Sequence, residues 1–143
     1  MGIIAIASNH AGVDLKAQLK DHLTGLGHEV LDLGPESTAS VDYPDYADAM
    51  AATIRGGRAG RGVLICGSGI GISIAANRHA GIRCALVTSP EHAALARQHN
   101  DANAIAFGQR LTDPLKAEYY LSVFLQTPFE GGRHQRRVEK IEC

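Results

Sequence analysis

The chain has 143 residues and a formal net charge of -1, with 45% hydrophobic and 20% charged residues. This length suffices for one domain with its own core, and the near-neutral charge excludes the strong positive field typical of a nucleic-acid-binding protein. No apolar run is long enough to span a bilayer, and the three cysteines lack C-x-x-C spacing. We therefore expect one cytoplasmic domain over residues 1–143 that keeps its thiols reduced and binds neither nucleic acid nor a membrane.

The first half of the chain alternates short apolar runs with segments of helical periodicity. Leucines at positions 15, 19, 23 and 26 recur at helical spacing, which predicts a helix after the first apolar run. Pro44 favours a first helical turn, and the Gly56-Gly57 pair favours a helix end. In chain order we predict a strand at 2–8, a helix at 13–27, a strand at 28–34, a helix at 43–57 and a strand at 62–67.

The same alternation continues in the second half of the chain. Continuous apolar strands separated by helices are typical of a parallel sheet that is covered on both faces. The fold class is therefore α/β, a three-layer α/β/α Rossmann-like fold with a five-stranded parallel sheet. We predict a helix at 71–78, a strand at 82–87, a helix at 90–99, a strand at 104–108, a helix at 114–125 and a basic C-terminal helix at about 131–142.

Polar residues lie where the predicted strands end. In open α/β sheets, ligands bind beyond the carboxyl ends of the strands. Asn9 and His10 follow the first strand, and Cys66 ends the third. His99 and Asn100 come immediately before the fifth strand. We expect His10 and His99 to lie on this same ligand-binding side.

The glycines at positions 67, 69 and 71 follow Cys66 and open a predicted helix. Such glycines leave backbone N–H groups and a positive helix end free to hold a phosphate or an oxyanion. A dinucleotide site is the competing interpretation, but the spacing is G-x-G-x-G and the stretch follows the third strand. A P-loop is excluded because no Lys-Ser or Lys-Thr follows.

Cys66 is the candidate reactive side chain of this stretch. A thiol at the carboxyl end of a strand and beside a helix N-terminus can act as a thiolate nucleophile or base. Cys84, within IRCALV, fits a small buried hydrophobic residue better. None of the seven histidines lies in an H-E-x-x-H or comparable pattern, so no metal site is expected.

Arg133 and Arg137 are four residues apart on the predicted C-terminal helix and project from one side of it. A solvated basic face is one interpretation of this pattern. Guanidinium groups are also well shaped for bidentate binding of phosphate, which is the alternative.

Three segments resemble the ribose-5-phosphate isomerase B family, which includes galactose-6-phosphate and allose-6-phosphate isomerases: CGSGIGISIAANRHAGIRCALV, ARQHNDANAIAFGQR and FEGGRHQRRV. The resemblance covers nearly the whole chain. It implies an aldose-ketose isomerase without metal or cofactor, with conversion of ribose 5-phosphate to ribulose 5-phosphate as the first expectation. It also implies a homodimer with active sites shared between subunits, in some members paired into a tetramer.

The resemblance also implies a role for each matching residue. Cys66 matches the base that removes the C2 proton, and Ser68 stands near the C1 and C2 oxygens, where the Gly67, Gly69 and Gly71 amides would hold the enediolate. His99, with Asn100 beside it, matches the residue that opens the sugar ring. Arg110, Arg133 and Arg137 match the positions that bind the phosphate group. His10 and Tyr43 match residues that line the sugar.

Asn9 departs from the family pattern, which has aspartate before the histidine. An amide can hydrogen-bond a hydroxyl, but it neither accepts a proton nor carries negative charge. An isomerase of a tetrose or hexose phosphate is therefore an alternative, as is a sugar-phosphate-binding protein that has lost turnover. Retention of Cys66, Ser68 and His99 together favours the enzyme.

Overall fold

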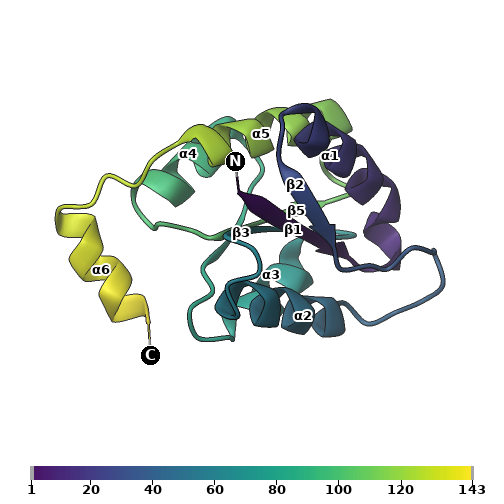
Figure 1. Cartoon of the computed structure of the whole chain (residues 1–143), viewed down its shortest axis with the longest axis horizontal. Coiled ribbons are helices and arrows are strands. Elements are labelled where there is room, and N and C mark those ends of the chain that lie inside the picture. Colours follow the sequence, from purple (N-terminus) through teal and green to yellow (C-terminus); the bar gives the residue numbers. More distant parts are fainter. Residues whose placement is uncertain (1, 143) are drawn as a thin grey trace.

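The computed structural model describes residues 2–142, which leaves Cys143 outside the described part of the chain. Its centre is a five-stranded sheet in which every neighbouring pair of strands is parallel (Figure 1). The strand order is β2-β1-β3-β5-β4. The predicted fold class is therefore confirmed. The strands are β1 (Ile3–Ser8), β2 (Glu29–Asp32), β3 (Arg61–Cys66), β4 (Cys84–Leu86) and β5 (Ala104–Gly108).

Helices cover both faces of the sheet, as crossovers between parallel strands require (Figure 1). A short 3-10 turn, η1 (His10–Gly12), joins β1 to the first helix. One face carries α1 (Val13–Gly25), α4 (Pro90–Gln98) and α5 (Pro114–Gln126), and the other carries α2 (Tyr43–Arg55) and α3 (Ile70–Asn77).

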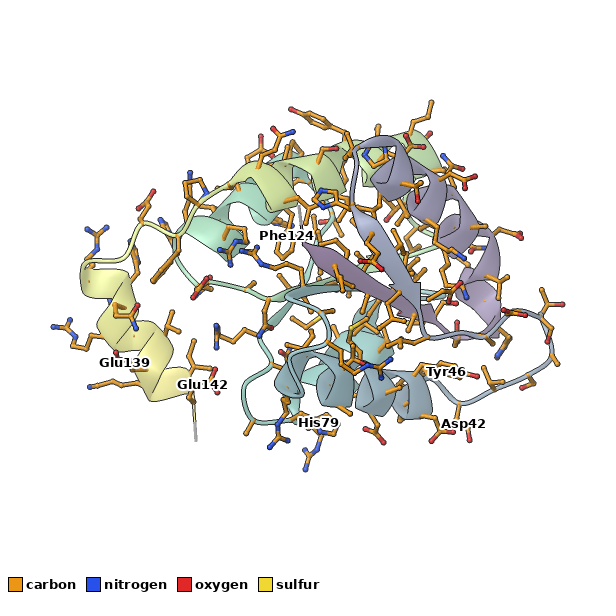
Figure 2. All side chains as sticks on the ribbon, in the orientation of Figure 1. Asp42, Tyr46, His79, Phe124, Glu139 and Glu142 are labelled. Carbon is orange, nitrogen blue, oxygen red and sulfur yellow. The ribbon has the colours of Figure 1, made fainter. Side chains whose placement is uncertain are left out.

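Alternate residues of the strands contribute to two different cores. Ile4 and Ile6 of β1 face the core under α1, α4 and α5. Phe107 and Phe124 are fully buried in this core, and Figure 2 labels Phe124. The core under α2 and α3 contains small side chains instead. It includes Ala5, Ala7, Ala47, Ala51, Ala104 and Ala106, together with Cys66. These small residues let α2 and α3 lie close to the sheet.

Several elements end earlier than the sequence predicts. The second strand ends at Asp32 because the Asp32 carboxylate accepts the N–H of Gly34 at 2.8 Å and turns the chain. The fourth strand is only Cys84–Leu86. Its amino end is held by the Asn77 side chain, which bonds both the N–H and the carbonyl of Cys84.

The C-terminal helix α6 (Arg133–Ile141) stands apart from the layered body (Figure 1). Its far end is tied to the body by an ion pair between Arg83 and Glu142, and Glu142 also accepts the N–H of Gly81 at 2.9 Å. Over residues 2–142, no helix combines the length and apolar character needed to cross a membrane.

Candidate active site

A cavity of about 460 Å³ opens beyond the carboxyl ends of β1 and β3. The chain leaves these neighbouring strands toward opposite sides of the sheet, which makes this the point where parallel α/β folds bind ligands. The lining residues are Asn9, Tyr43, Cys66, Gly67, Ser68, Ile70, Gly71, Arg110 and Leu111. The structure thus brings together most of the residues that the sequence analysis singled out after the first and third strands.

Cys66 ends β3 with its side chain at the wall of the cavity, and only 4% of the residue is exposed. Its Sγ accepts the backbone N–H of Gly69 at 3.1 Å, just before helix α3 begins. The hydrogen bond and the helix N-terminus both direct positive partial charge at the sulfur. The turn thus holds two electropositive groups against the thiol at the cavity wall.

The glycines after Cys66 permit close approaches of neighbouring groups. Gly69 has φ +79, and a Cβ there would lie 2.8 Å from the Phe107 carbonyl carbon. A Cβ on Gly71 would lie 2.7 Å from Cζ of Tyr43, so the tyrosine ring occupies the place of a side chain. Gly69 therefore requires glycine, whereas a side chain at position 71 would displace the Tyr43 ring.

Two backbone N–H groups of this turn already have partners within the chain. The Gly69 N–H binds the sulfur, and the Ile70 N–H donates to Ser68 Oγ at 3.2 Å. The expectation that the backbone N–H groups of this turn are free to bind an anion therefore does not hold for Gly69 and Ile70. At Gly69 the amide acts on the Cys66 sulfur.

The Asn9 amide has a fixed orientation. Its Oδ1 accepts the N–H of Ala11 at 3.0 Å and caps the η1 turn. Only the oxygen end of an amide can accept this bond, so Nδ2 is the end left for the cavity that Asn9 lines. Asn9 therefore offers the cavity a hydrogen-bond donor. Arg110 supplies a positive charge, with its guanidinium beside Gly67.

Six predicted site residues do not line this cavity: His10, Gly69, His99, Asn100, Arg133 and Arg137. His99 ends helix α4, which leads into β5. In a parallel sheet, a helix that leads into a strand ends at the amino edge of the sheet, opposite the edge where Cys66 lies. The expectation that His99 shares the ligand side with His10 is therefore wrong within one chain.

His10 contacts the segment after β2 instead of lining the cavity. Its Nδ1 accepts the N–H of Val41 at 3.1 Å in the unprotonated form of the ring. The Val41 carbonyl oxygen lies 3.2 Å from the same nitrogen. His10 thus anchors the approach to helix α2, and the prediction that it contacts the sugar remains untested.

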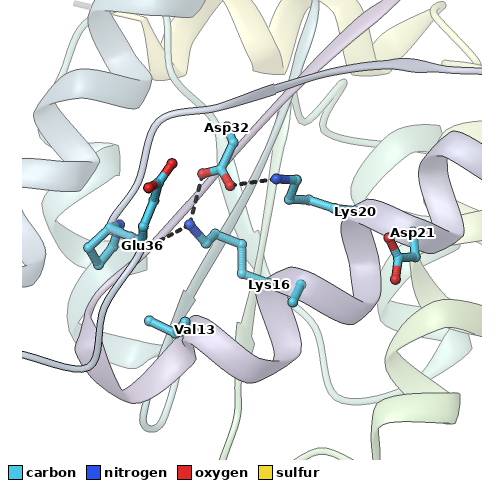
Figure 3. Close-up of a pocket in the computed structure, with 8 residues that line it drawn as sticks. Val13, Lys16, Lys20, Asp21, Asp32 and Glu36 are labelled. Atoms are coloured by element: carbon cyan, nitrogen blue, oxygen red, sulfur yellow. Dashed lines mark hydrogen bonds and ion pairs between the residues drawn. The ribbon is translucent and has the colours of Figure 1, made fainter.

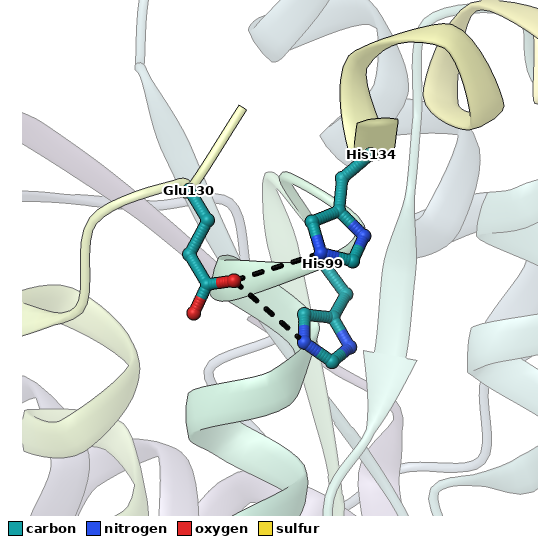
Figure 4. A group of neighbouring side chains, drawn as sticks. All are labelled: His99, Glu130 and His134. Atoms are coloured by element: carbon teal, nitrogen blue, oxygen red, sulfur yellow. Dashed lines mark ion pairs between the residues drawn. The ribbon is translucent and has the colours of Figure 1, made fainter. Parts of the chain in front are cut away.

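His99 belongs to a second cluster with Glu130 and His134 (Figure 4). The two imidazole rings stack with centroids 4.2 Å apart and planes at 11°. Glu130 Oε1 lies 3.9 Å from Nε2 of His99 and 3.5 Å from Nε2 of His134. The sequence analysis did not assign Glu130 and His134 to a site, because Glu130 lies in the loop before α6 and no local pattern pairs it with His134.

His134 is kept neutral by its surroundings. Burial lowers its pKa, and the nearby charges of His99 and Arg133 act in the same direction, while Glu130 opposes them. Among residues 2–142, its Nε2 is buried without a hydrogen-bond partner. The cluster therefore pairs a buried imidazole with the more exposed ring of His99.

The three side chains of this cluster place ligand atoms within 4.8 Å of one another, as a metal site would. However, stacked imidazoles direct their in-plane lone pairs side by side, and a shared metal needs lone pairs that converge. One ring would have to rotate before both could bind a metal. The stacked arrangement therefore does not fit a metal shared by the two rings.

Comparison with known proteins gives a consistent result over the whole chain. Residues 4–141 match the family model described as Ribose/Galactose Isomerase. Ribose-5-phosphate isomerase B of Escherichia coli is 46% identical over 138 residues, which cover 96% of this chain and 93% of that protein. A crystal structure of a ribose 5-phosphate isomerase from Thermotoga maritima superposes with a TM-score of 0.97 at 50% identity, covering 99% of this chain and 97% of that one. The enzyme from Clostridium thermocellum has a TM-score of 0.96 at 44% identity, with coverage of 97% and 94%.

Proposed function

Because the chain belongs to the ribose/galactose isomerase family, we propose that it interconverts an aldose phosphate and a ketose phosphate, first of all ribose 5-phosphate and ribulose 5-phosphate. The observation that carries this proposal is the Cys66 sulfur at the cavity wall with the Gly69 N–H directed at it. A protein that only binds a sugar phosphate has no use for a base in that position.

The reaction moves one proton from C2 to C1 and a second from the C2 hydroxyl to the C1 oxygen. The Cys66 thiolate takes the proton from C2 of the open-chain aldose, and the C–H electrons form the C1–C2 double bond of an enediolate. The C1 oxygen gains the negative charge, which nearby N–H and O–H donors stabilise. The C1 oxygen then takes the proton of the C2 hydroxyl. The C2 oxygen forms the carbonyl as the thiol returns its proton to C1, which regenerates the thiolate and leaves the ketose. The donors available at the cavity are Asn9 Nδ2, Ser68 Oγ, Arg110 and the amides of the 67–71 turn other than those of Gly69 and Ile70.

Ring opening and phosphate binding require residues from a second copy of the chain. His99, Asn100, Arg133 and Arg137 do not line the cavity of their own chain. A homodimer brings them to the cavity of the other subunit, where His99 opens the furanose ring and the arginines hold the phosphate. Ile70 and Ile74 of α3 support self-association, because these neighbouring side chains are 49% and 60% exposed beside the cavity. Pairing of such dimers into tetramers is compatible with this arrangement.

A second candidate substrate follows from the orientation of Asn9. Its Nδ2 donates to a carbonyl or hydroxyl oxygen but cannot accept the proton of a ring hydroxyl. This favours an aldose phosphate that is already open, such as a tetrose phosphate, over a cyclic pentose or hexose phosphate. The reaction and the base are the same in both cases. A reducing compartment such as the cytoplasm suits an enzyme that works through a free thiol.

The test is a panel of tetrose, pentose and hexose phosphates assayed for aldose-ketose conversion with and without EDTA. We expect conversion of ribose 5-phosphate or a tetrose phosphate, unchanged by EDTA. Binding of these sugars without any turnover would identify the protein as the non-catalytic alternative. Activity lost with a stoichiometric metal would contradict the mechanism.

A further inference from the structure

Segment 33–42, which joins β2 to α2, is fastened at its start by a buried lysine (Figure 3). Lys16 projects from α1, and only 3% of the residue is exposed. Its Nζ donates to Asp32 Oδ1 at 2.8 Å and to the carbonyl oxygen of Pro35 at 2.6 Å. One ammonium group therefore joins the end of β2 to the first turn of the segment.

The surrounding charges keep this ammonium in place. Asp32 also accepts Lys20 Nζ at 2.9 Å and the Gly34 N–H at 2.8 Å, so both of its oxygens have hydrogen-bond partners. Asp21 and Glu36 line the same cavity of about 290 Å³ and add negative charge around the lysines. A buried ammonium is stable only with such partners. Both partners of the Lys16 ammonium group therefore belong to the protein, and the group is not available to bind an external anion.

The fastened segment leads directly into the active-site cavity. The Gly34 carbonyl accepts the N–H of Ser8 at 3.1 Å, and His10 binds the backbone of Val41. Tyr43 lies two residues after Val41 and begins helix α2. Its side chain lines the active-site cavity and occupies the space above Gly71. The position of the Tyr43 ring thus depends on a segment whose start is set by Lys16.

We propose that Lys16 is a positioning residue of the active site: by binding Asp32 and the Pro35 carbonyl it fixes segment 33–42 and so holds Tyr43 against Gly71. The consequence for turnover rests on the proposed isomerase function, whereas the consequence for the segment does not. Lys16 lies outside the active-site cavity and acts on the substrate through Tyr43 alone. Its loss should therefore affect substrate binding more than the proton transfer at Cys66.

The experiment is a double-mutant cycle of Lys16→Met and Tyr43→Ala, read out as kcat and KM. We expect Lys16→Met to raise KM roughly tenfold with kcat nearly unchanged, and to have little further effect in the Tyr43→Ala background. Lys20→Met is the matched control. It removes a partner of the same carboxylate, but Lys20 is 39% exposed at its side chain and donates only to Asp32. Lys16→Arg should restore part of the binding.

Hydrogen exchange provides a measurement that does not depend on activity. In Lys16→Met, amides of segment 33–42 should exchange faster than in wild type while those of α5 remain protected. If Lys16→Met does not fold, Lys16→Gln serves in its place with the same expected results. Unchanged exchange in segment 33–42, or KM effects of Lys16 and Tyr43 that simply multiply, would overturn the proposal. A wild-type protein without isomerase activity would contradict the proposed function and leave the exchange result to decide the role of Lys16.

Discussion

The N–H of Gly69 donates a hydrogen bond to Sγ of Cys66 at 3.1 Å, across three residues that turn from strand β3 into helix α3. The same glycine has φ +79 and no space for a side chain. The donor is therefore held in place by the backbone and needs no reorganisation when charge develops on the sulfur. Such fixed donors act most strongly in sites shielded from water.

Replacement of Cys66 by alanine should abolish isomerisation, because it removes the base, and should lower the free energy of unfolding by less than about 2 kcal/mol. The control is Cys84→Ala, which removes the other described cysteine. Burial raises the pKa of Cys84 to about 12, so this thiol stays protonated at neutral pH and should not matter for turnover. Steady-state kinetics measures the loss of turnover in each variant, and urea denaturation measures the change in the free energy of unfolding. Turnover within a few-fold of wild type in Cys66→Ala would remove Cys66 from the mechanism.

Replacement of Gly69 by alanine should destabilise the fold by about 1 to 3 kcal/mol through backbone strain, and activity should fall as the N–H moves away from the sulfur. Gly25→Ala is the matched control. Gly25 lies in α1, and an added Cβ would meet nothing within 4 Å. Thermal denaturation should show the loss only for Gly69→Ala. Equal stability of the two variants would mean that the Gly69 backbone relaxes freely.

Mixing inactive Cys66→Ala and His99→Ala homodimers should restore activity, because half of the sites in a heterodimer carry both intact residues. Random exchange of subunits would give about one quarter of the wild-type activity. Subunit exchange is verified with differently tagged chains. No recovery after proven exchange would argue against sites shared between subunits.

Replacement of Asn9 by aspartate should favour ribose 5-phosphate over an acyclic aldose phosphate. An aspartate oxygen still accepts the Ala11 N–H, so the turn is kept, while the other oxygen becomes an acceptor for a ring hydroxyl. A charged hydrogen bond of this kind contributes roughly 1.5 to 3 kcal/mol, which corresponds to about a ten- to hundredfold gain in kcat/KM for the cyclic substrate. Both kcat/KM values are measured in both proteins. Equal effects on the two substrates would make Asn9 a neutral replacement.

Acid should weaken the fold through Asp32. Burial opposes the charge on this carboxylate, but hydrogen bonds from Lys16, Lys20 and the Gly34 N–H outweigh burial and hold its pKa below the ordinary value of 3.8. The unfolded chain therefore binds the proton first, and this part of the free energy of unfolding is lost as the pH falls below about 4. Urea denaturation at a series of pH values should show a shallower loss in Asp32→Asn than in wild type. Parallel curves would exclude Asp32 as the titrating group.

The sequence was sufficient to predict the five-stranded sheet and about half of the residues of the active site. Strands such as β3 and β5 are continuous apolar runs, and the rule that ligands bind at carboxyl ends located Cys66, Ser68 and Asn9. His99 lies at the opposite edge of the sheet, because it comes before β5 in the chain and not after a strand. The distinction follows from chain direction and could have been made from the sequence.

Other features depend on contacts between distant parts of the chain. The stack of His99 on His134 joins the end of α4 to the start of α6, and no local pattern specifies it. The fastening of Pro35 by Lys16 depends on a backbone carbonyl, which any residue supplies. Such interactions leave no signature in a single sequence.

The alanine-rich layer under α2 couples the core to the active-site cavity. Helix α2 carries Tyr43 at its first residue and rests through Ala47 and Ala51 on the alanines of β1. A larger side chain in this layer would displace the helix and shift the tyrosine, although the substituted position lies outside the cavity. The shape of the cavity can thus be changed from within the core while every residue that lines it remains the same.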